Sequence, residues 1–128
     1  MAKRKNGRAK TPSFVMLRKD IITSKQYSDL SHKAVKLLID VLEQFNGNNN
    51  GDLCVTMSVM KKKGWVSSGT LQAAKNELVR KGWLELTRQG GRHMCSLYAI
   101  SFYQIHECGG KHDRRPTAIP SNLWKVEN

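Results

Sequence analysis

Residues 56–86 read TMSVMKKKGWVSSGTLQAAKNELVRKGWLEL, and their caps, glycines and apolar spacing predict two helices followed by a strand. Thr56 is a residue type that caps helices, so a short helix is predicted over 57–63. Gly64 ends that helix, because glycine readily takes the left-handed conformation that follows a last helical turn.

A second helix follows after a short turn. Ser67 or Ser68 caps it, apolar residues recur at helical spacing up to about Lys81, and Gly82 stands in the C′ position. Two helices joined by a short turn that contains glycine form the helix-turn-helix pattern.

The sequence after Gly82 predicts a β-hairpin. Residues 83–88 alternate as a half-buried strand does, 89–92 form the tip, and 94–102 form the returning strand. The remaining residues have no long periodic segment. Trp124 and its apolar neighbours are expected to pack on the chain's own domain or on a partner.

The sequence before residue 56 predicts one long helix and several smaller elements. Ser31 is the expected N-cap of a helix that runs through Phe45 and carries a wide apolar stripe. A short irregular helix is predicted over 21–30, a surface loop over 46–52 and a short strand over 53–55.

The predicted elements follow the order of a winged helix-turn-helix: a core helix, a short strand, two helices and a hairpin. The predicted fold class is therefore α+β, mainly α with a small hairpin wing. The winged-helix domain is expected over 14–103, between a disordered basic arm over 1–13 and a C-terminal extension over 104–128.

The helix expected over 68–81 has two different faces. Leu71, Ala74 and Leu78 fall on one side and should pack inward. The opposite side contains no acidic residue and is formed by Gly69, Gln72, Ala73, Asn76 and Arg80.

Such a face suits the major groove of DNA, although a merely solvated helix is the alternative interpretation. Glutamine and asparagine can pair with adenine, so we expect Gln72 and Asn76 to read bases. Gly69 and Ala73 are small enough to allow close approach. The residues expected mainly to position the helix on phosphates are Ser67, Ser68, Thr70 and Arg80.

Further cations surround this helix. On the hairpin, Arg88, Arg92 and His93 are expected to contact the DNA backbone or minor groove. Lys61 and Lys62 belong to the preceding helix, which crosses the phosphate backbone in this geometry, although a solvated face explains them equally well. The N-terminal arm either follows phosphates or only aids solubility, and its cations are Lys3, Arg4, Lys5 and Arg8.

The chain of 128 residues carries a net charge of +12, which attracts polyanions, chiefly nucleic acid. No apolar run reaches the ~20 residues needed to cross a bilayer, and no secretory signal follows the basic N-terminus. We therefore expect no membrane partner and a cytoplasmic location. The three cysteines are widely spaced, which favours a reducing compartment over a disulfide framework.

Patterns typical of other functions are weak. Cys95, His106, Cys108 and His112 are potential zinc ligands, but they lack the paired spacing of a zinc site. No nucleophile–base–acid arrangement can be recognised from spacing. We therefore expect no enzymatic activity, no cofactor, no metal and no small-molecule substrate.

Several segments between Phe14 and the C-terminus resemble a family of phage- and prophage-encoded helix-turn-helix proteins. They include Ala34-Val35-Lys36-Leu37-Leu38, Ser68-Gly69-Thr70-Leu71, Leu86-Thr87-Arg88-Gln89-Gly90-Gly91, Ser96-Leu97-Tyr98-Ala99 and Ile105-His106-Glu107-Cys108-Gly109-Gly110-Lys111. The resemblance implies a DNA-binding fold and a phage or other mobile element of bacteria as the source. A more distant resemblance is to the winged-helix domains of plasmid and phage replication initiators.

The expected function is therefore sequence-specific binding of double-stranded DNA by a transcriptional regulator of a phage or other mobile element. Residues 68–81 would enter the major groove, with 88–93 beside them. Because one such domain buries little DNA surface, a homodimer on paired half-sites is expected. Two alternatives stay open: a replication-initiation or partition protein that binds origin repeats, and an RNA-binding or protein-interaction (inhibitor) domain of the same fold.

Overall fold

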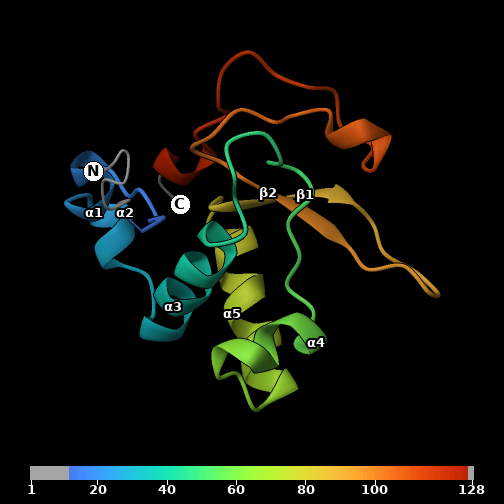
Figure 1. The fold of residues 1–128 in the computed structure, drawn as a ribbon. Helices are drawn as coiled ribbons and strands as arrows, with labels where there is room; N and C mark the ends of the chain where they lie inside the picture. Colours follow the sequence, from blue (N-terminus) through green and yellow to red (C-terminus); the bar gives the residue numbers. More distant parts are fainter. Residues whose placement is uncertain (1–11, 127–128) are drawn as a thin grey trace, which may run out of the picture.

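Two long helices form the centre of the protein, whose computed structural model describes residues 12–126 (Figure 1). The first, α3 (His32–Leu42), begins at Ser31, whose hydroxyl accepts a hydrogen bond from the Ala34 N–H at 3.1 Å. The second, α5 (Ser68–Arg80), lies beside it. Each helix turns one apolar stripe toward the other, and burial of those stripes provides most of the driving force for packing.

The core continues from the two long helices into the hairpin and the C-terminal segment. Trp83 stands directly after α5 and is fully buried. Around it pack apolar residues of all these elements, among them Leu37, Leu38, Val41, Leu71, Leu78, Leu84, Ile100, Phe102 and Trp124.

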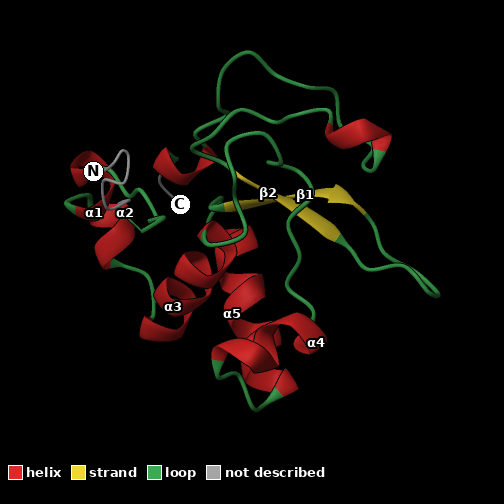
Figure 2. Ribbon diagram, in the orientation of Figure 1, coloured by secondary structure: helices red, strands yellow, loops and turns green. Residues whose placement is uncertain are grey.

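Strands β1 (Leu84–Arg88) and β2 (Leu97–Ile100) form a two-stranded antiparallel hairpin, drawn as yellow arrows in Figure 2. Leu84 lies opposite Ile100, and a register shift interrupts the pairing between Leu86 and Arg88. The fold is thus α+β, as predicted.

The hairpin differs from the prediction at its outer end. The returning strand was expected over 94–102, but β2 is shorter because Gly90 donates its N–H to the Ser96 hydroxyl at 2.8 Å, away from a backbone ladder. The tip was expected over 89–92. Instead, Gly91 and Met94 bond to each other and leave Arg92 and His93 as the two turn residues.

The first half of the chain also corrects two predicted helices. The irregular helix over 21–30 is two single turns, α1 (Lys19–Ile22) and α2 (Lys25–Ser28), because the Ser24 hydroxyl caps α2 at the Tyr27 N–H. The core helix ends at Leu42, short of Phe45, because the next hydrogen bonds span three residues and tighten the last turn.

The strand predicted over 53–55 is reduced to one bridge between Leu53 and Tyr98. The side-chain amide of Gln44 takes the place of a strand partner, since it bonds both the N–H and the C=O of Cys54 at 2.9 and 2.7 Å. Thr56 occupies the N-cap position of α4 (Met57–Met60), but its hydroxyl contacts Ser58 Oγ and caps no backbone N–H, contrary to the prediction.

The remaining short elements are single 3₁₀ turns. The first, η1 (Lys61–Lys63), continues α4, and Gly64 follows it at φ +95°. Two more, η2 (Cys108–Gly110) and η3 (Leu123–Lys125), belong to the C-terminal segment, which crosses the molecule beside the hairpin and α5 (Figure 1). This segment packs on the chain's own core, where Trp124 is buried.

Between residues 12 and 126 no helix is long and apolar enough to cross a membrane.

Candidate nucleic-acid interface

Helix α5 is held in place at both ends by its own sequence. Ser67 Oγ accepts the Thr70 N–H at 3.2 Å, which confirms the predicted N-cap. At the other end, Gly82 has φ +82°, and the Trp83 N–H bonds the Leu78 carbonyl at 2.8 Å. This bond is the 6→1 bond of a Schellman motif, which needs a left-handed residue at C′. The ends of the helix are therefore fixed.

The faces of α5 lie as the periodicity predicts. Leu71, Ala74 and Leu78 are buried against the core. The opposite side is exposed to solvent and includes every residue predicted for it: Gly69, Gln72, Ala73, Asn76 and Arg80. Ser68 is also exposed, whereas Thr70 is half-buried.

The one acidic residue of α5 is turned away from this exposed face. Glu77 accepts the Ser31 N–H at 2.8 Å and the Ser31 hydroxyl at 2.7 Å, and Lys81 Nζ lies 3.3 Å away. Burial opposes ionisation, but the hydrogen bonds from Ser31 and the neighbouring Lys81 outweigh it and lower the pKa of Glu77. The carboxylate therefore ties α5 to the start of α3, at the edge of the exposed face, where Glu77 lines a hollow together with Gly69 and Ala73.

The three predicted hairpin cations occupy different environments. Arg92 and His93 are exposed at the turn, with His93 at φ +63°. Arg88 is half-buried, and its guanidinium donates to the carbonyls of Cys95 at 2.7 Å and Lys111 at 3.2 Å. These bonds hold the hairpin to the C-terminal segment, and the contact of Arg88 with DNA stays a prediction.

The three lysines before α5 also differ in whether they are bonded within the protein. Lys61 and Lys62 are exposed, and in residues 12–126 neither forms an ion pair. Lys63 pairs with Glu43, and its carbonyl accepts a bond from Lys36 Nζ at 2.8 Å. The first two lysines are therefore available to an anionic partner.

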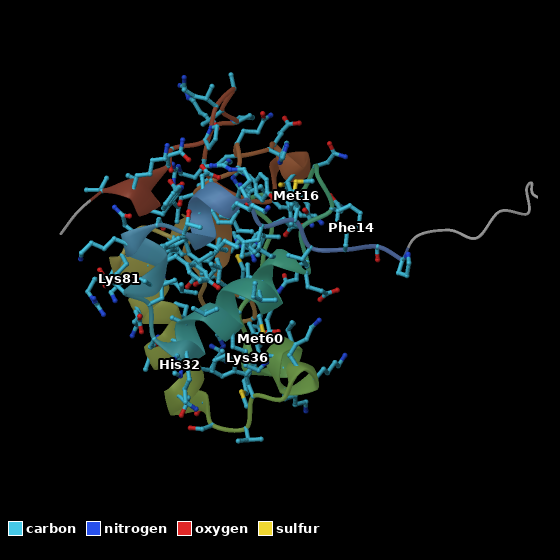
Figure 3. All side chains as sticks on the ribbon, turned by 90° about the vertical axis from the view of Figure 1, so that its left-hand side faces the viewer. Phe14, Met16, His32, Lys36, Met60 and Lys81 are labelled. Atoms are coloured by element: carbon cyan, nitrogen blue, oxygen red, sulfur yellow. The ribbon has the colours of Figure 1, made fainter. Side chains whose placement is uncertain are left out.

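Further residues that the sequence pattern does not indicate lie beside α5. A groove of about 420 Å³ runs between α5 and the hairpin, and Lys75 and Gln89 line it together with Gln72. On the other side of α5, His32 and Lys33 line a shallow hollow beside Gly69; Figure 3 shows His32 at the start of α3. In the sequence, charge is the signal for Lys33 and Lys75, and Gln89 carries none; the position of all four residues beside α5 depends on long-range packing.

The two histidines near the C-terminus contact backbone polar groups. His106 Nδ1 accepts the Asn50 N–H at 3.1 Å, and His112 Nε2 lies 2.6 Å from the His106 carbonyl oxygen. In the part of the chain that the structure describes, no three His, Cys, Asp or Glu residues gather in a way that could hold a metal ion.

The predicted cations of the N-terminal arm, Lys3, Arg4, Lys5 and Arg8, lie outside the described residues. Comparison of the chain with protein-family models, with curated proteins and with solved structures finds no match.

Proposed function

We propose that this protein is a winged-helix protein that binds specific sequences of double-stranded DNA, has no enzymatic activity, and acts as a transcriptional regulator of a phage or other mobile element. The observation that carries the proposal is the composition of the exposed face of α5. Gln72 and Asn76 offer amide donors and acceptors there, Arg80 adds a cation, and the only acid of the helix is bonded to Ser31.

The dimensions of α5 fit the role of a recognition helix. Its 13 residues span about 20 Å at 1.5 Å per residue. A helix is narrow enough to enter the major groove, where an amide side chain bonds two edge atoms of adenine at once. Gly69 and Ala73 are one turn apart and have small side chains or none, so the helix surface beside Gln72 and Asn76 can approach the bases closely.

Cations on two sides of α5 suit the flanking phosphates. Lys61 and Lys62 precede the helix, and Arg92 and His93 form the hairpin turn beyond the groove that Lys75 lines. Positive charge at these points attracts DNA of any sequence, so it supports affinity and position, whereas the amides of α5 supply discrimination. Two copies on paired half-sites would provide the interface area that one domain lacks.

The proposal is tested by selection from a pool of random DNA duplexes, followed by salt titration on the enriched site. A short enriched motif, paired as half-sites, is the expected result. Gln72→Ala and Asn76→Ala should each lose about 1–3 kcal/mol of discrimination at one base pair. Gln104→Ala is the matched control, because Gln104 is an equally exposed amide far along the chain from α5.

Two outcomes would reject the proposal. Binding that is tight at low salt, equal for all duplexes and unchanged by Gln72→Ala would leave only phosphate attraction. Preference for RNA of equal length and charge over every duplex would assign the surface to RNA.

A further inference from the structure

Two of the three cysteines lie side by side. Cys54 Sγ and Cys95 Sγ are 3.9 Å apart, although 41 residues separate them along the chain. Both are reduced and half-buried. The third, Cys108, has a different neighbour, since its Sγ lies 3.6 Å from the Asn50 carbonyl oxygen.

The backbone around each of the two cysteines is fixed by hydrogen bonds. Leu53, next to Cys54, exchanges two backbone bonds with Tyr98 at 3.2 and 2.9 Å. Gln44 holds the N–H and the C=O of Cys54 itself. On the other side, Arg88 donates to the Cys95 carbonyl at 2.7 Å. The approach of the two thiols is therefore part of the folded structure.

We propose that Cys54 and Cys95 are a redox modification site that closes into a reversible intramolecular disulfide. Closure shortens the distance between the two sulfurs from 3.9 Å to the S–S bond length of about 2.05 Å. A disulfide that forms and breaks inside a reducing compartment is typical of redox sensing rather than of permanent structural support.

The oxidant is a small disulfide such as oxidised glutathione. The thiolate of one cysteine attacks a sulfur of that disulfide, forms a mixed disulfide and releases one glutathione thiolate. The second cysteine then loses its proton and attacks the protein sulfur of the mixed disulfide, which releases the second glutathione. Two protein thiols are oxidised and one small disulfide is reduced to two thiols.

Burial, together with the neighbouring Cys54, raises the pKa of Cys95. Whichever cysteine attacks first, the other lies close enough to resolve the mixed disulfide, because their sulfurs are 3.9 Å apart.

The bond would join the segment that enters α4 to the outer part of the hairpin, between its turn and β2. Cys95 lines the groove between α5 and the hairpin together with Gln72 and Lys75. The redox state of the pair would therefore alter the DNA-binding surface. This consequence rests on the proposed function, whereas the thiol chemistry does not.

The full chain is equilibrated with mixtures of reduced and oxidised glutathione, and its free thiols are then trapped by alkylation. Mass spectrometry measures the intact mass and identifies disulfide-linked peptides. The wild type should lose two alkylation sites and the mass of two hydrogens, with Cys54 linked to Cys95. Cys108→Ser is the matched control and should oxidise at the same glutathione ratio. Cys95→Ser should stop at a stable mixed disulfide on Cys54.

Circular dichroism of each variant separates loss of the thiol from loss of the fold. The proposal is overturned if the folded wild type keeps all three thiols under oxidised glutathione, or if its disulfides join two chains or include Cys108. Affinity for the selected DNA site is then compared between the oxidised and reduced protein. A closed disulfide with no effect on any nucleic acid would reject the link to binding while leaving the modification site in place.

Discussion

The indole of Trp124 stacks on that of Trp83, with ring centroids 5.2 Å apart and an angle of 28° between the planes. Trp83 directly follows the C′ residue of α5, and Trp124 lies near the C-terminal end of the described chain. The contact therefore couples the C-terminal segment to the end of the proposed recognition helix. Stacked aromatic pairs add to the stabilisation that burial of their area provides.

Trp124→Ala should destabilise the protein by about 3–5 kcal/mol, because it removes a buried aromatic side chain and leaves a cavity beside Trp83. Urea denaturation followed by circular dichroism measures the change. Ile119→Ala is the control in the same segment: Ile119 is 74% exposed, so its truncation should change stability by less than about 0.5 kcal/mol. Equal effects of the two variants would show that the segment does not stabilise the domain.

Gly82→Ala should cost about 1–3 kcal/mol, because φ is +82° and a Cβ would stand 2.5 Å from the Leu123 carbonyl oxygen. The same substitution at Gly91, where a Cβ would meet nothing within 4 Å, should change stability little. Thermal unfolding of the two variants gives the comparison. Similar melting temperatures would mean that the C-terminal segment does not pack closely against Gly82 at the end of α5.

Asn50→Ala should cost about 2–4 kcal/mol. Asn50 is fully buried, its Nδ2 donates to the carbonyls of Ile100 and Tyr103, and its Oδ1 accepts the Ile100 N–H at 2.7 Å. Truncation leaves these buried backbone groups without a partner. Asn48→Ala, an exposed change in the same loop, is the control for denaturant unfolding. An equal loss of stability in both variants would show that the effect comes from substitution anywhere in this loop and not from the buried amide of Asn50.

Glu77→Gln should make the pH dependence of stability weaker. Since folding lowers the pKa of Glu77, its interactions stabilise the protein above the ordinary carboxyl pKa and are lost as the pH falls through the folded-state value. The variant should be less stable by about 1–2 kcal/mol at neutral pH, with the difference shrinking in acid. Urea titrations from neutral pH into acid measure this.

Glu107→Gln is the control for the Glu77 experiment, because Glu107 is exposed and forms no ion pair in residues 12–126. Its stability should follow the wild-type pH profile. A Glu77→Gln profile that coincides with the wild-type profile at every pH would show that the carboxylate bonds contribute nothing to folding.

Arg92→Ala should change DNA binding, whereas Arg88→Ala should change stability. Arg92 is an exposed turn residue, so its loss should reduce the salt slope of DNA binding by about 0.9 and leave the melting temperature unchanged. Arg88 donates to two backbone carbonyls, so its loss should cost about 1–3 kcal/mol of folding free energy. DNA binding at several salt concentrations and thermal unfolding distinguish them. An Arg92→Ala variant whose salt slope equals that of the wild type would remove Arg92 from the interface.

Local signals in the sequence were sufficient for α5 and for the start of α3. The caps at Ser31 and Ser67, the glycine at position 82 and the spacing of Leu71, Ala74 and Leu78 are each encoded within a few residues. Because helix ends and helix faces depend on such short spacings, the solvent-facing residues of α5 could be predicted without a structure.

Long-range contacts set the limits of that prediction. The strand expected over 53–55 was replaced by the amide of Gln44, and Arg88 was drawn to the Lys111 carbonyl, 23 residues away. The proximity of Cys54 and Cys95 likewise has no local signal. Polar side chains accept any partner with the right geometry, so only the packed chain decides which one they meet.

Residue type and periodicity over one or two turns were thus sufficient for α5, the start of α3, the caps at Ser31 and Ser67, the presence of a hairpin and the side of α5 that faces solvent. Only the tertiary structure decided which cations stay free and which are bound, that Asn50 is buried, and that Trp124 covers the end of α5. Those outcomes depend on distances between segments that lie far apart along the chain, which no local pattern encodes.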